Sequence, residues 1–440
     1  MPGRPFLQIP GPTLVPERIV RAMSQPIIDH RGPRFAALVQ VCLDGLKRVF
    51  QTRTGHVILY PGSGTGAWEA AIVNTLSPGD RVLACVNGHF STGFARTAEA
   101  YGIECERVEV PYGDGVAADV LERRLRADAA HQFKALLVVH NETSTGVTSN
   151  VAALRAALDR AGHPALLLVD TVSSLASIDF RFEDWGVDVA LTGPQKGLML
   201  PPGMAILAIS ERALTASDKA RCPRSYWDWR PVLERNRRGE FPYTPATMLL
   251  FGLEEALKML DEEGLPDVFK RHWRLAEACR RAVRALGLAI LCRNPAEYSN
   301  TLTAVVMPPG FDSDEFVRHA YHRLNLSLGV GLGAVKGKVF RIGHLGSLNE
   351  LDLLGGLAGV EMMLKDFGVL VVPGAGLGRP GVPAELGGQW GSERLRPRRT
   401  SRATRIRLTT RSPRRRARSC RRAGADSAWR AHGRSPRSRR

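Results

Sequence analysis

A lysine and an aspartate near the ends of two apolar segments are the residues of this chain best placed for chemistry. Lys196 follows the apolar run 187–191 in a short polar turn, and Asp170 ends the apolar run 165–169. A lysine amine can form a Schiff base with the aldehyde of pyridoxal phosphate, and a carboxylate can hold a proton on the pyridine nitrogen. Most lysines are only solvated, and an aspartate at a strand end is often a helix cap, so the surrounding sequence has to decide.

A glycine-rich segment at 61–67, with the letters PGSGTGA, separates an apolar run from a helical pattern. Glycines permit close approach of the backbone, and a helix start presents free N–H groups to an anion such as a phosphate. The same letters fit a dinucleotide fingerprint, but that reading requires an acidic residue after the next strand, where the chain has Asn87 and Gly88. A phosphate-binding turn and a tight turn without a ligand are the two main alternatives.

Three further candidates lie near predicted strand ends or inside a strand. Phe90 is placed to lie against a cofactor ring, although an ordinary core aromatic is the commoner reading. The polar run 140–146, which includes Thr143, predicts a ligand-facing loop, with a helix cap as its alternative. Arg341 lies in an apolar strand and needs a partner, either a substrate carboxylate or a structural ion pair. The eleven histidines show no metal-ligand spacing, so no metal site is predicted.

The charge of the chain is concentrated in one segment. Residues 369–440 contain 20 of the 61 Lys and Arg residues and only three of the 43 Asp and Glu residues, which gives +17 of the net charge of +18. The remaining residues are nearly neutral, as in a metabolic enzyme. We interpret residues 376–440 as a disordered Arg-rich tail, because they lack the apolar side chains of a core. An out-of-frame ending explains this composition, and non-specific nucleic-acid binding by the tail is the functional alternative.

Signals for a membrane segment, secretion or disulfides are not found in the sequence. Seven cysteines occur without a CxxC pair, which is typical of a reduced intracellular protein without structural zinc. The first residues, MPGRP, lack the apolar segment of a secretory signal, and no run of 18 apolar residues occurs. We therefore expect a cytoplasmic protein without membrane association.

Apolar runs alternate with amphipathic stretches from about residue 35 to 210, which predicts an α/β fold. Strands are expected at 57–60, 81–86, 135–140, 165–170, 187–191 and 204–209, and helices at 65–76, 90–101 and 151–161. Strands that are apolar throughout favour a mostly parallel sheet with helices on both faces. Residues 211–250 are expected to be irregular and 250–286 helical. The predicted parts are an N-terminal arm (1–25), a large domain (26–255), a small α+β domain (256–375) and the tail (376–440).

Seven strings in unbroken order resemble the class V aminotransferases of fold type I, and most of all the serine–glyoxylate and alanine–glyoxylate enzymes. They are IPGP (9–12), SGTGAWE (63–69), VHNETSTG (139–146), LVDT (168–171), QKG (195–197), PYTP (242–245) and KVFRIGH (338–344). The resemblance runs from about residue 5 to 373. It implies pyridoxal phosphate as the cofactor and a ping-pong transfer of the amino group of serine, or of alanine, to glyoxylate. The implied products are hydroxypyruvate or pyruvate, and glycine.

The resemblance also implies roles for the site residues. Lys196 forms the Schiff base and moves the substrate proton, and Asp170 pairs with the pyridine nitrogen. Arg341 binds the substrate carboxylate, and Thr143 contacts the cofactor or the substrate. Cofactor binding is further implied for Ser63, Gly64, Thr65, Phe90, Val172, Gln195, Tyr243 and Thr244. The segment with Tyr243 and Thr244 resembles one that reaches the phosphate of the partner subunit, so a homodimer is expected.

Two features depart from the family pattern. Pro194 stands where the family usually has serine, which removes an N–H group and a hydroxyl beside the lysine. The C-terminal helix of the family is not recognisable after about residue 375.

Cysteine desulfuration is the alternative reaction within the fold, but it usually requires a histidine before the lysine, where this chain has Gln195. The alternative of another class is a nucleic-acid-binding protein on an inactive scaffold.

Overall fold

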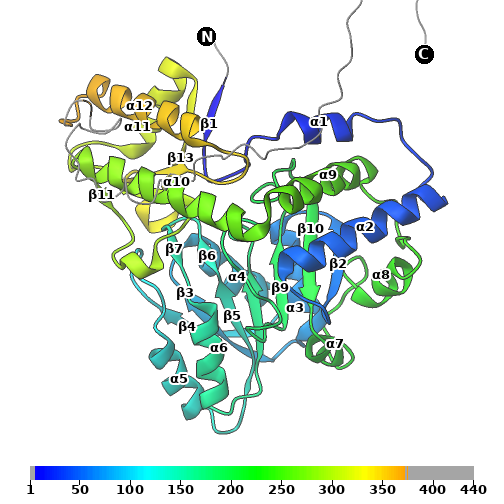
Figure 1. Ribbon diagram of the computed structural model, residues 1–440. Coiled ribbons are helices and arrows are strands. Elements are labelled where there is room, and N and C mark those ends of the chain that lie inside the picture. The colour runs from blue at the N-terminus through cyan, green and yellow to red at the C-terminus, as the bar shows by residue number, and fades with distance from the viewer. Residues whose placement is uncertain (1–4, 372–373, 375–440) are drawn as a thin grey trace, which may run out of the picture. The chain divides into compact units, whose positions relative to one another are not determined.

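Two main β-sheets with flanking helices make up the part of the chain that the structure, a computed structural model, describes: residues 5–371 and 374 (Figure 1). The larger sheet has seven strands and the smaller has five. The predicted tail at 376–440 lies outside the described residues.

The seven-stranded sheet has the order β2-β10-β9-β8-β5-β3-β4. Its strands are β2 (His56–Pro61), β3 (Arg81–Val86), β4 (Glu104–Glu109), β5 (Phe133–Val139), β8 (Leu166–Asp170), β9 (Val189–Thr192) and β10 (Met204–Ile209). β10 is antiparallel to both of its neighbours, and the pairs from β9 to β4 are all parallel. The predicted, mostly parallel sheet is confirmed, and the carboxyl ends of all its strands except β10 meet at one edge.

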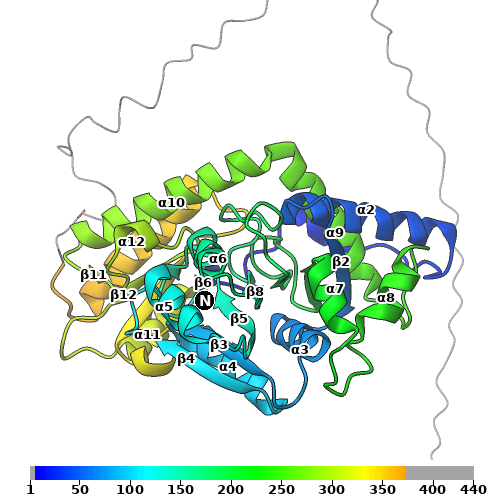
Figure 2. The ribbon, with the colours of Figure 1, turned by 90° about the horizontal axis from the view of Figure 1, so that it is seen from below.

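Alternate residues of these strands face two separate cores, because successive side chains of a strand point to opposite faces. In β5, Leu136 and Val138 belong to one core, and Ala135 and Leu137 belong to the other. The first core is covered by α2 (Pro33–Phe50), α5 (Ala118–Ala127), α6 (Val151–Arg160) and α9 (Thr247–Glu263), and the second by α3 (Gly64–Thr75), α4 (His89–Ala100), α7 (Glu211–Ser217) and α8 (Trp229–Asn236). Figure 2 shows α4 and α6 on opposite sides of β5.

The five-stranded sheet has the order β1-β13-β14-β12-β11 and is formed by both ends of the described chain. Its strands are β1 (Phe6–Gln8), β11 (Ala289–Ile290), β12 (Leu302–Val306), β13 (Leu326–Val330) and β14 (Val339–Gly343), and α10 (Leu265–Ala285), α11 (Ser313–Leu324) and α12 (Glu350–Asp366) lie beside it. β1 runs parallel to β13, with Leu7 opposite Ser327. The expected second α+β region is therefore present, and the N-terminal segment contributes a strand to it.

Several elements differ from the expectation. β4 was not predicted, because this edge strand carries the polar sequence ECERVE and has no apolar run. Residues 211–250 are not irregular throughout: they contain α7, α8 and the start of α9, and α8 buries Trp229 and Val232 against the second core. The expected N-terminal arm includes α1 (Glu17–Met23) as well as β1. The helical stretch 250–286 is broken at Gly264, whose φ of 82° suits glycine.

The division into a large domain (26–255) and a small domain (256–375) stays a proposal. Its boundary falls inside α9, and Leu257 and Leu260, beyond that boundary, pack in the first core of the large sheet.

Candidate active site

Lys196 lies in the turn after β9, at the carboxyl edge of the seven-stranded sheet. Its Nζ donates a hydrogen bond to the backbone oxygen of Pro10 at a distance of 2.5 Å. Thr13 holds the same turn, since its amide and its hydroxyl donate to the backbone oxygens of Gln195 and Lys196 at 3.1 and 3.2 Å. A Cβ on Gly11 would lie 2.4 Å from the Lys196 Cδ, so only glycine leaves room for the lysine side chain here.

The environment of Lys196 favours its neutral amine. Burial lowers the pKa of Lys196 to about 8, the positive charge of Arg341 adds to this effect, and Asp170 opposes it. A larger share of this amine is therefore unprotonated near neutral pH than for a solvated lysine. An unprotonated amine can act as a nucleophile and as a base.

Asp170, the last residue of β8, is buried beside this lysine and is held by two hydrogen bonds. Its Oδ1 accepts from the amide of Val172 and its Oδ2 accepts from the indole Nε1 of Trp68, both at 2.7 Å. Burial raises the pKa of Asp170 to about 6, although both hydrogen bonds oppose the rise. No role was predicted for Trp68, because a contact between a helix and a strand 102 residues apart leaves no local pattern in the sequence.

The glycine-rich turn between β2 and α3 forms a helix start at the same edge. Ser63 is its N-cap residue, and its Oγ accepts from the amide of Gly66 at 3.1 Å. Gly64 lies against Val172, where a Cβ would come within 2.8 Å of a methyl group. Among residues 5–371, no hydrogen bond is found from the amides of Gly64 and Thr65, so both N–H groups can bind an anion.

Phe90 and Thr143 complete the wall of a cavity of about 160 Å³ between these elements. Phe90 is the second residue of α4 and is partly exposed. Thr143 lies in the polar loop after β5, between the short strands β6 (Asn141–Glu142) and β7 (Val147–Thr148), and its Oγ1 donates to the Ser173 Oγ at 2.8 Å. The predicted residues that line the cavity are Ser63, Gly64, Thr65, Phe90, Thr143, Asp170, Val172, Gln195 and Lys196; the unpredicted ones are Trp68, Val139, Asn141 and Ser173.

Arg341 reaches the same loop from β14. Its Nη1 donates to the backbone oxygen of Thr143 and its Nε to that of Val330, both at 2.9 Å. Burial lowers the pKa of Arg341 to about 10, and the charge of Glu142 opposes this effect. No ion pair of Arg341 and no hydrogen bond of its Nη2 is found within residues 5–371 and 374, so the alternative of a structural ion pair finds no support there.

Comparison with known proteins places this geometry in a family. Residues 6–329 match the family of class-V aminotransferases. The chain belongs to this family. It is 49% identical over 381 residues to the serine–glyoxylate aminotransferase of Methylorubrum extorquens, which covers 86% of this chain and 95% of the relative. It is 47% identical over 369 residues to the L-aspartate–glyoxylate aminotransferase of Paracoccus denitrificans, which covers 84% and 93%.

Solved structures of other aminotransferases share the fold. An alanine–glyoxylate aminotransferase from Nostoc sp. has a TM-score of 0.78 at 30% identity and covers 83% of this chain and 97% of its own. The ureidoglycine–glyoxylate aminotransferase of Bacillus subtilis has a TM-score of 0.79 at 26% identity, with coverages of 86% and 97%. The chain is therefore an aminotransferase of fold type I, a group of enzymes that depend on pyridoxal phosphate, and the predicted family is confirmed.

Two residues predicted from the family, Tyr243 and Thr244, do not line the cavity of this single chain. The Tyr243 hydroxyl donates to the backbone oxygen of Leu59 at 2.7 Å, and its ring stacks on Tyr60 with the ring centroids 6.1 Å apart. Their contact with the phosphate of a partner subunit stays a prediction.

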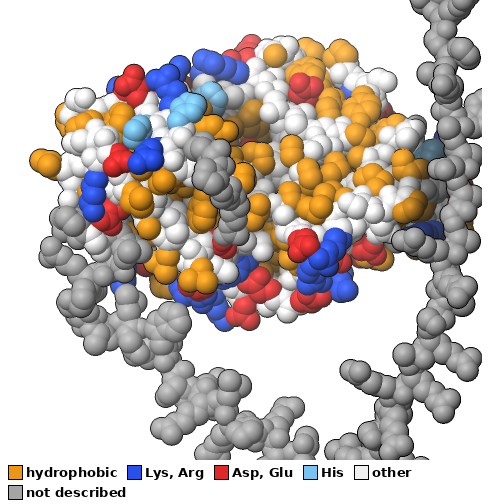
Figure 3. All heavy atoms as spheres, turned by 90° about the horizontal axis from the view of Figure 1, so that it is seen from above, with side chains coloured by type: hydrophobic (Ala, Val, Ile, Leu, Met, Phe, Trp, Pro, Cys, Tyr) orange, Lys and Arg blue, Asp and Glu red, His pale blue; other side chains and the backbone are white. Residues whose placement is uncertain are grey.

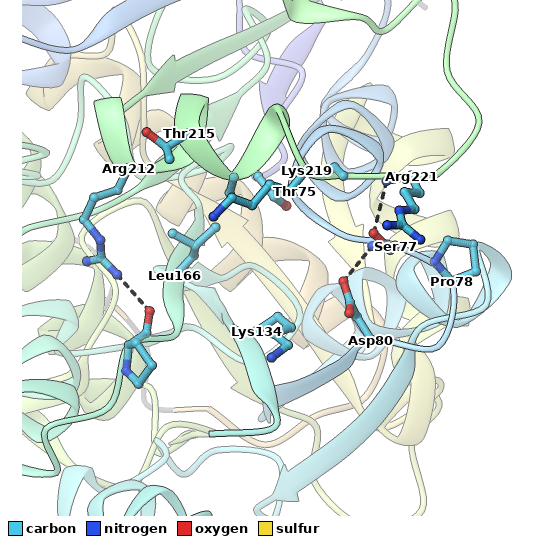
Figure 4. Close-up of a pocket in the computed structure, with 13 residues that line it drawn as sticks. Thr75, Ser77, Pro78, Asp80, Lys134, Leu166, Arg212, Thr215, Lys219 and Arg221 are labelled. Atoms are coloured by element: carbon cyan, nitrogen blue, oxygen red, sulfur yellow. Dashed lines mark hydrogen bonds between the residues drawn. The ribbon is translucent and has the colours of Figure 1, made fainter. Parts of the chain in front are cut away.

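A larger hollow, of about 800 Å³, lies at the opposite edge of the seven-stranded sheet, where β3, β5 and β8 begin. Figure 4 shows its cationic side chains, Lys134, Arg212, Lys219 and Arg221. All four are exposed, and Asp80, an acid in the lining, accepts a hydrogen bond from the Ser77 amide at 2.7 Å. None of the titratable side chains among its lining residues is buried, so we do not assign the hollow to the reaction.

Other kinds of site receive no support in the described part of the chain. Residues 5–371 and 374 contain no group of three or more His, Cys, Asp or Glu residues that could hold a metal ion. None of the helices described is long and apolar enough to cross a membrane. The six described cysteines are free, and none lines the active-site cavity.

Proposed function

We propose that this chain is a pyridoxal phosphate-dependent aminotransferase that passes the amino group of serine, or of alanine, to glyoxylate. The products are hydroxypyruvate, or pyruvate, and glycine. The observation that carries the proposal is that Lys196, with its lowered pKa, and Asp170 line one cavity beside a free helix start. The choice of substrates rests on relatives such as the serine–glyoxylate aminotransferases of Methylorubrum extorquens and Arabidopsis thaliana, at 49% and 48% identity.

The residues of the cavity suit this cofactor. The Ser63 hydroxyl and the amides of Gly64 and Thr65 lie at a helix start, which favours a phosphate group. Gln195 has a buried Oε1 without a partner among the described residues, as expected of an amide that contacts a ligand. The ring of Phe90 offers a flat apolar surface on the same cavity.

Lys196 and Asp170 divide the proton chemistry. When bound, pyridoxal phosphate supplies the electron sink that makes the Cα–H bond of the substrate acidic. With the cofactor bound, the Lys196 amine would accept the Cα proton of the substrate and carry it during the exchange, and the backbone oxygen of Pro10 orients this amine. Asp170, with a pKa of about 6, is mostly ionised at neutral pH and would hold a proton on the pyridine nitrogen of the bound cofactor.

Arg341 binds the α-carboxylate of each substrate in turn. Its guanidinium is fixed by the backbone oxygens of Thr143 and Val330, and its Nη2 remains for a carboxylate oxygen. Amino donor and oxo-acid acceptor share this carboxylate, so one arginine serves both halves of a ping-pong exchange.

A half-reaction screen tests this function. Purified protein loaded with pyridoxal phosphate is mixed with serine, alanine or aspartate, and the cofactor absorbance is followed. We expect serine and alanine to convert the cofactor to its amine form and glyoxylate to restore it. Conversion by aspartate alone would contradict the proposed donor, and no conversion by any amino acid would contradict the proposed activity. Lys196→Ala is the matched negative control.

Cysteine desulfuration is not favoured. That reaction needs a mobile nucleophilic cysteine near the lysine, whereas no described cysteine lines the cavity. Burial raises the pKa of Cys85 and of Cys279, to about 12 and about 11, which keeps these thiols protonated.

We also propose that the protein works as a cytoplasmic homodimer, with Tyr243 and Thr244 reaching the phosphate in the partner subunit. Exposed apolar side chains support a subunit interface, since large apolar patches mark association surfaces. Figure 3 shows such side chains on the upper face, and Leu14, Val20 and Ile27 near α1 are 56%, 44% and 79% exposed. Sedimentation analysis should give twice the chain mass, and a monomer with full activity would contradict the proposal.

A further inference from the structure

A buried glutamate next to the candidate site is not explained by the chemistry described so far. We propose that Glu142 is a positioning residue: its carboxylate fixes the start of α4, and with it the ring of Phe90, to the loop that carries Thr143 and receives Arg341. The proposal rests on the proposed function, because it assigns to Phe90 and Thr143 the cofactor-binding roles given above.

The carboxylate of Glu142 binds the free amides at the start of α4. The side chain is 0% exposed. Its Oε2 accepts from the amide of Ser91 at 2.8 Å, and its Oε1 accepts from that of Phe90 at 3.3 Å. The first amides of a helix have no partner inside the helix, and a negative charge there is favoured by the helix dipole. One carboxylate therefore holds the backbone of Phe90 and of its neighbour.

Ser144 binds one more amide of the same helix start, and we call the side chains of Glu142 and Ser144 together the clamp. Its Oγ accepts from the amide of His89 at 2.9 Å and donates to the Glu142 Oε1 at 2.7 Å, and its own amide donates to the same oxygen at 3.1 Å. The amides of residues 89, 90 and 91 are thus all bound by two side chains from one loop. Any shift of this loop is transmitted to the ring of Phe90.

The contact leaves no free space. A Cβ on Gly88 would lie 2.4 Å from the Cγ and Cδ of Glu142 and 2.5 Å from the Oγ of Ser144. The residue before α4 must therefore be glycine for the loop and the helix to approach this closely. Such close packing restricts the position of the carboxylate as strictly as its hydrogen bonds do.

The same loop is tied to the residue that we propose for substrate binding. Thr143, between Glu142 and Ser144, accepts from the Arg341 Nη1 through its backbone oxygen at 2.9 Å. Glu142 also adds its charge to the site: burial is the main reason that the pKa of Asp170 is raised, and the negative charge of Glu142 contributes. The loop therefore joins the ring-binding and carboxylate-binding sides of the cavity.

A double-mutant cycle tests whether Glu142 acts through Phe90. Glu142→Gln keeps the size of the side chain but replaces one acceptor oxygen by an NH₂ group facing N–H donors. We expect Glu142→Gln to weaken pyridoxal phosphate binding by about tenfold, as for a lost hydrogen bond to a charged group. Phe90→Ala should weaken it by about as much, because the variant lacks the aromatic ring. If Glu142 works by placing Phe90, the double variant should bind within about threefold of Phe90→Ala alone. Losses that multiply to about a hundredfold would overturn the proposal, as would unchanged binding by Glu142→Gln.

Asp188→Asn is the matched control for a general loss of stability. Asp188 is also buried, and its carboxylate accepts from the Leu167 amide at 2.8 Å and the Ser210 hydroxyl at 3.0 Å. We expect this variant to melt at a lower temperature and yet to bind the cofactor within about twofold of the wild type. Equal losses of cofactor binding in Glu142→Gln and Asp188→Asn would show that Glu142 only stabilises the fold.

Hydrogen exchange separates this inference from the proposed function. In the cofactor-free protein, the amides of residues 89–91 should exchange faster in Glu142→Gln, and Ser144→Ala should release mainly that of residue 89. Ser144→Ala also replaces Glu142→Gln in the cycle if the latter does not fold. Unchanged exchange overturns the clamp even if the wild type is an active aminotransferase. A wild type that binds no pyridoxal phosphate overturns the proposed function, while the exchange result still decides the clamp.

Discussion

The two edges of the seven-stranded sheet carry comparable charged residues in opposite environments. At the carboxyl edge, Lys196, Asp170 and Arg341 surround a cavity of about 160 Å³ or contact its wall, and burial shifts the pKa of each. At the amino edge, a hollow of about 800 Å³ is lined by four exposed cations. The larger and more basic hollow is therefore the less reactive one, since chemistry depends on desolvation of the charged groups and not on their number.

This contrast has a physical basis. Water and salt screen exposed charges at the amino edge, so electrostatic interactions between them are weak. At the carboxyl edge, the protein replaces water by fixed partners such as the backbone oxygen of Pro10 and the indole of Trp68. Equivalent substitutions at the two edges should then have very different consequences.

The largest difference is expected for the two lysines. Lys196→Ala removes the proposed nucleophile and proton carrier, and the transamination rate should fall by roughly 10²–10⁴. Its counterpart Lys219→Ala should retain the wild-type rate. Steady-state kinetics and the cofactor spectrum measure both, and a similar loss of rate in the two variants would contradict the contrast.

The two aspartates should differ next. Asp170→Asn keeps the shape of the side chain but removes the charge that we propose to hold the pyridine proton, so kcat should fall roughly ten- to a hundredfold while some cofactor remains bound. Asp80→Asn at the amino edge is the control, because it removes one charge that contacts the Ser77 amide. A rate that is unchanged in Asp170→Asn would rule out its role.

The two arginines test substrate binding. Arg341→Lys replaces a planar fork by a point charge, and the KM for serine and for glyoxylate should each rise about tenfold or more. Arg212→Lys should leave both KM values as they are, although its side chain donates to the backbone oxygen of Pro164 at 3.0 Å. If Arg341→Lys lowers the melting temperature without changing either KM, the arginine has a structural role only.

The smallest expected effect is on stability. Because the folded protein disfavours the charged form of Lys196, this lysine costs stability below its folded pKa of about 8, and the cost disappears as the pH rises past 10.5. Cofactor-free Lys196→Met should therefore be more stable than the wild type at pH 7, by about 1–3 kcal/mol. The gain should shrink between pH 8 and 10.5. Lys219→Met should be within about 0.5 kcal/mol of the wild type throughout, and denaturant unfolding at several pH values measures this.

The site residues at strand ends could be predicted because their positions follow from the sheet. Parallel strands bring their carboxyl ends to one edge, so Asp170 at the end of β8, Lys196 after β9 and Thr143 after β5 had to lie close together. The glycine-rich turn was predictable for the same reason. Alternation of apolar strands with helices likewise predicted the α/β fold.

The remaining features depend on contacts between distant segments. The bond from Trp68 to Asp170, the pairing of β1 with β13 and the clamp formed by Glu142 join residues that share no local pattern. β4 was missed because an edge strand needs no apolar run, and α7 and α8 because short helices carry too few residues for a clear period.

The segment from β1 to Thr13 has a consequence for the order in which the protein is built. The bond from Lys196 to Pro10 spans 186 residues, and Phe6 pairs with Leu326 near the other end of the described chain. Contacts between such distant positions form late in folding. During synthesis, the strands of the large sheet and the glycine-rich turn can be complete while β13 has not yet left the ribosome. At that stage β1 has no β13 to pair with, so Pro10 is not yet held in place beside Lys196. The active site is therefore complete only after β1 has paired with β13.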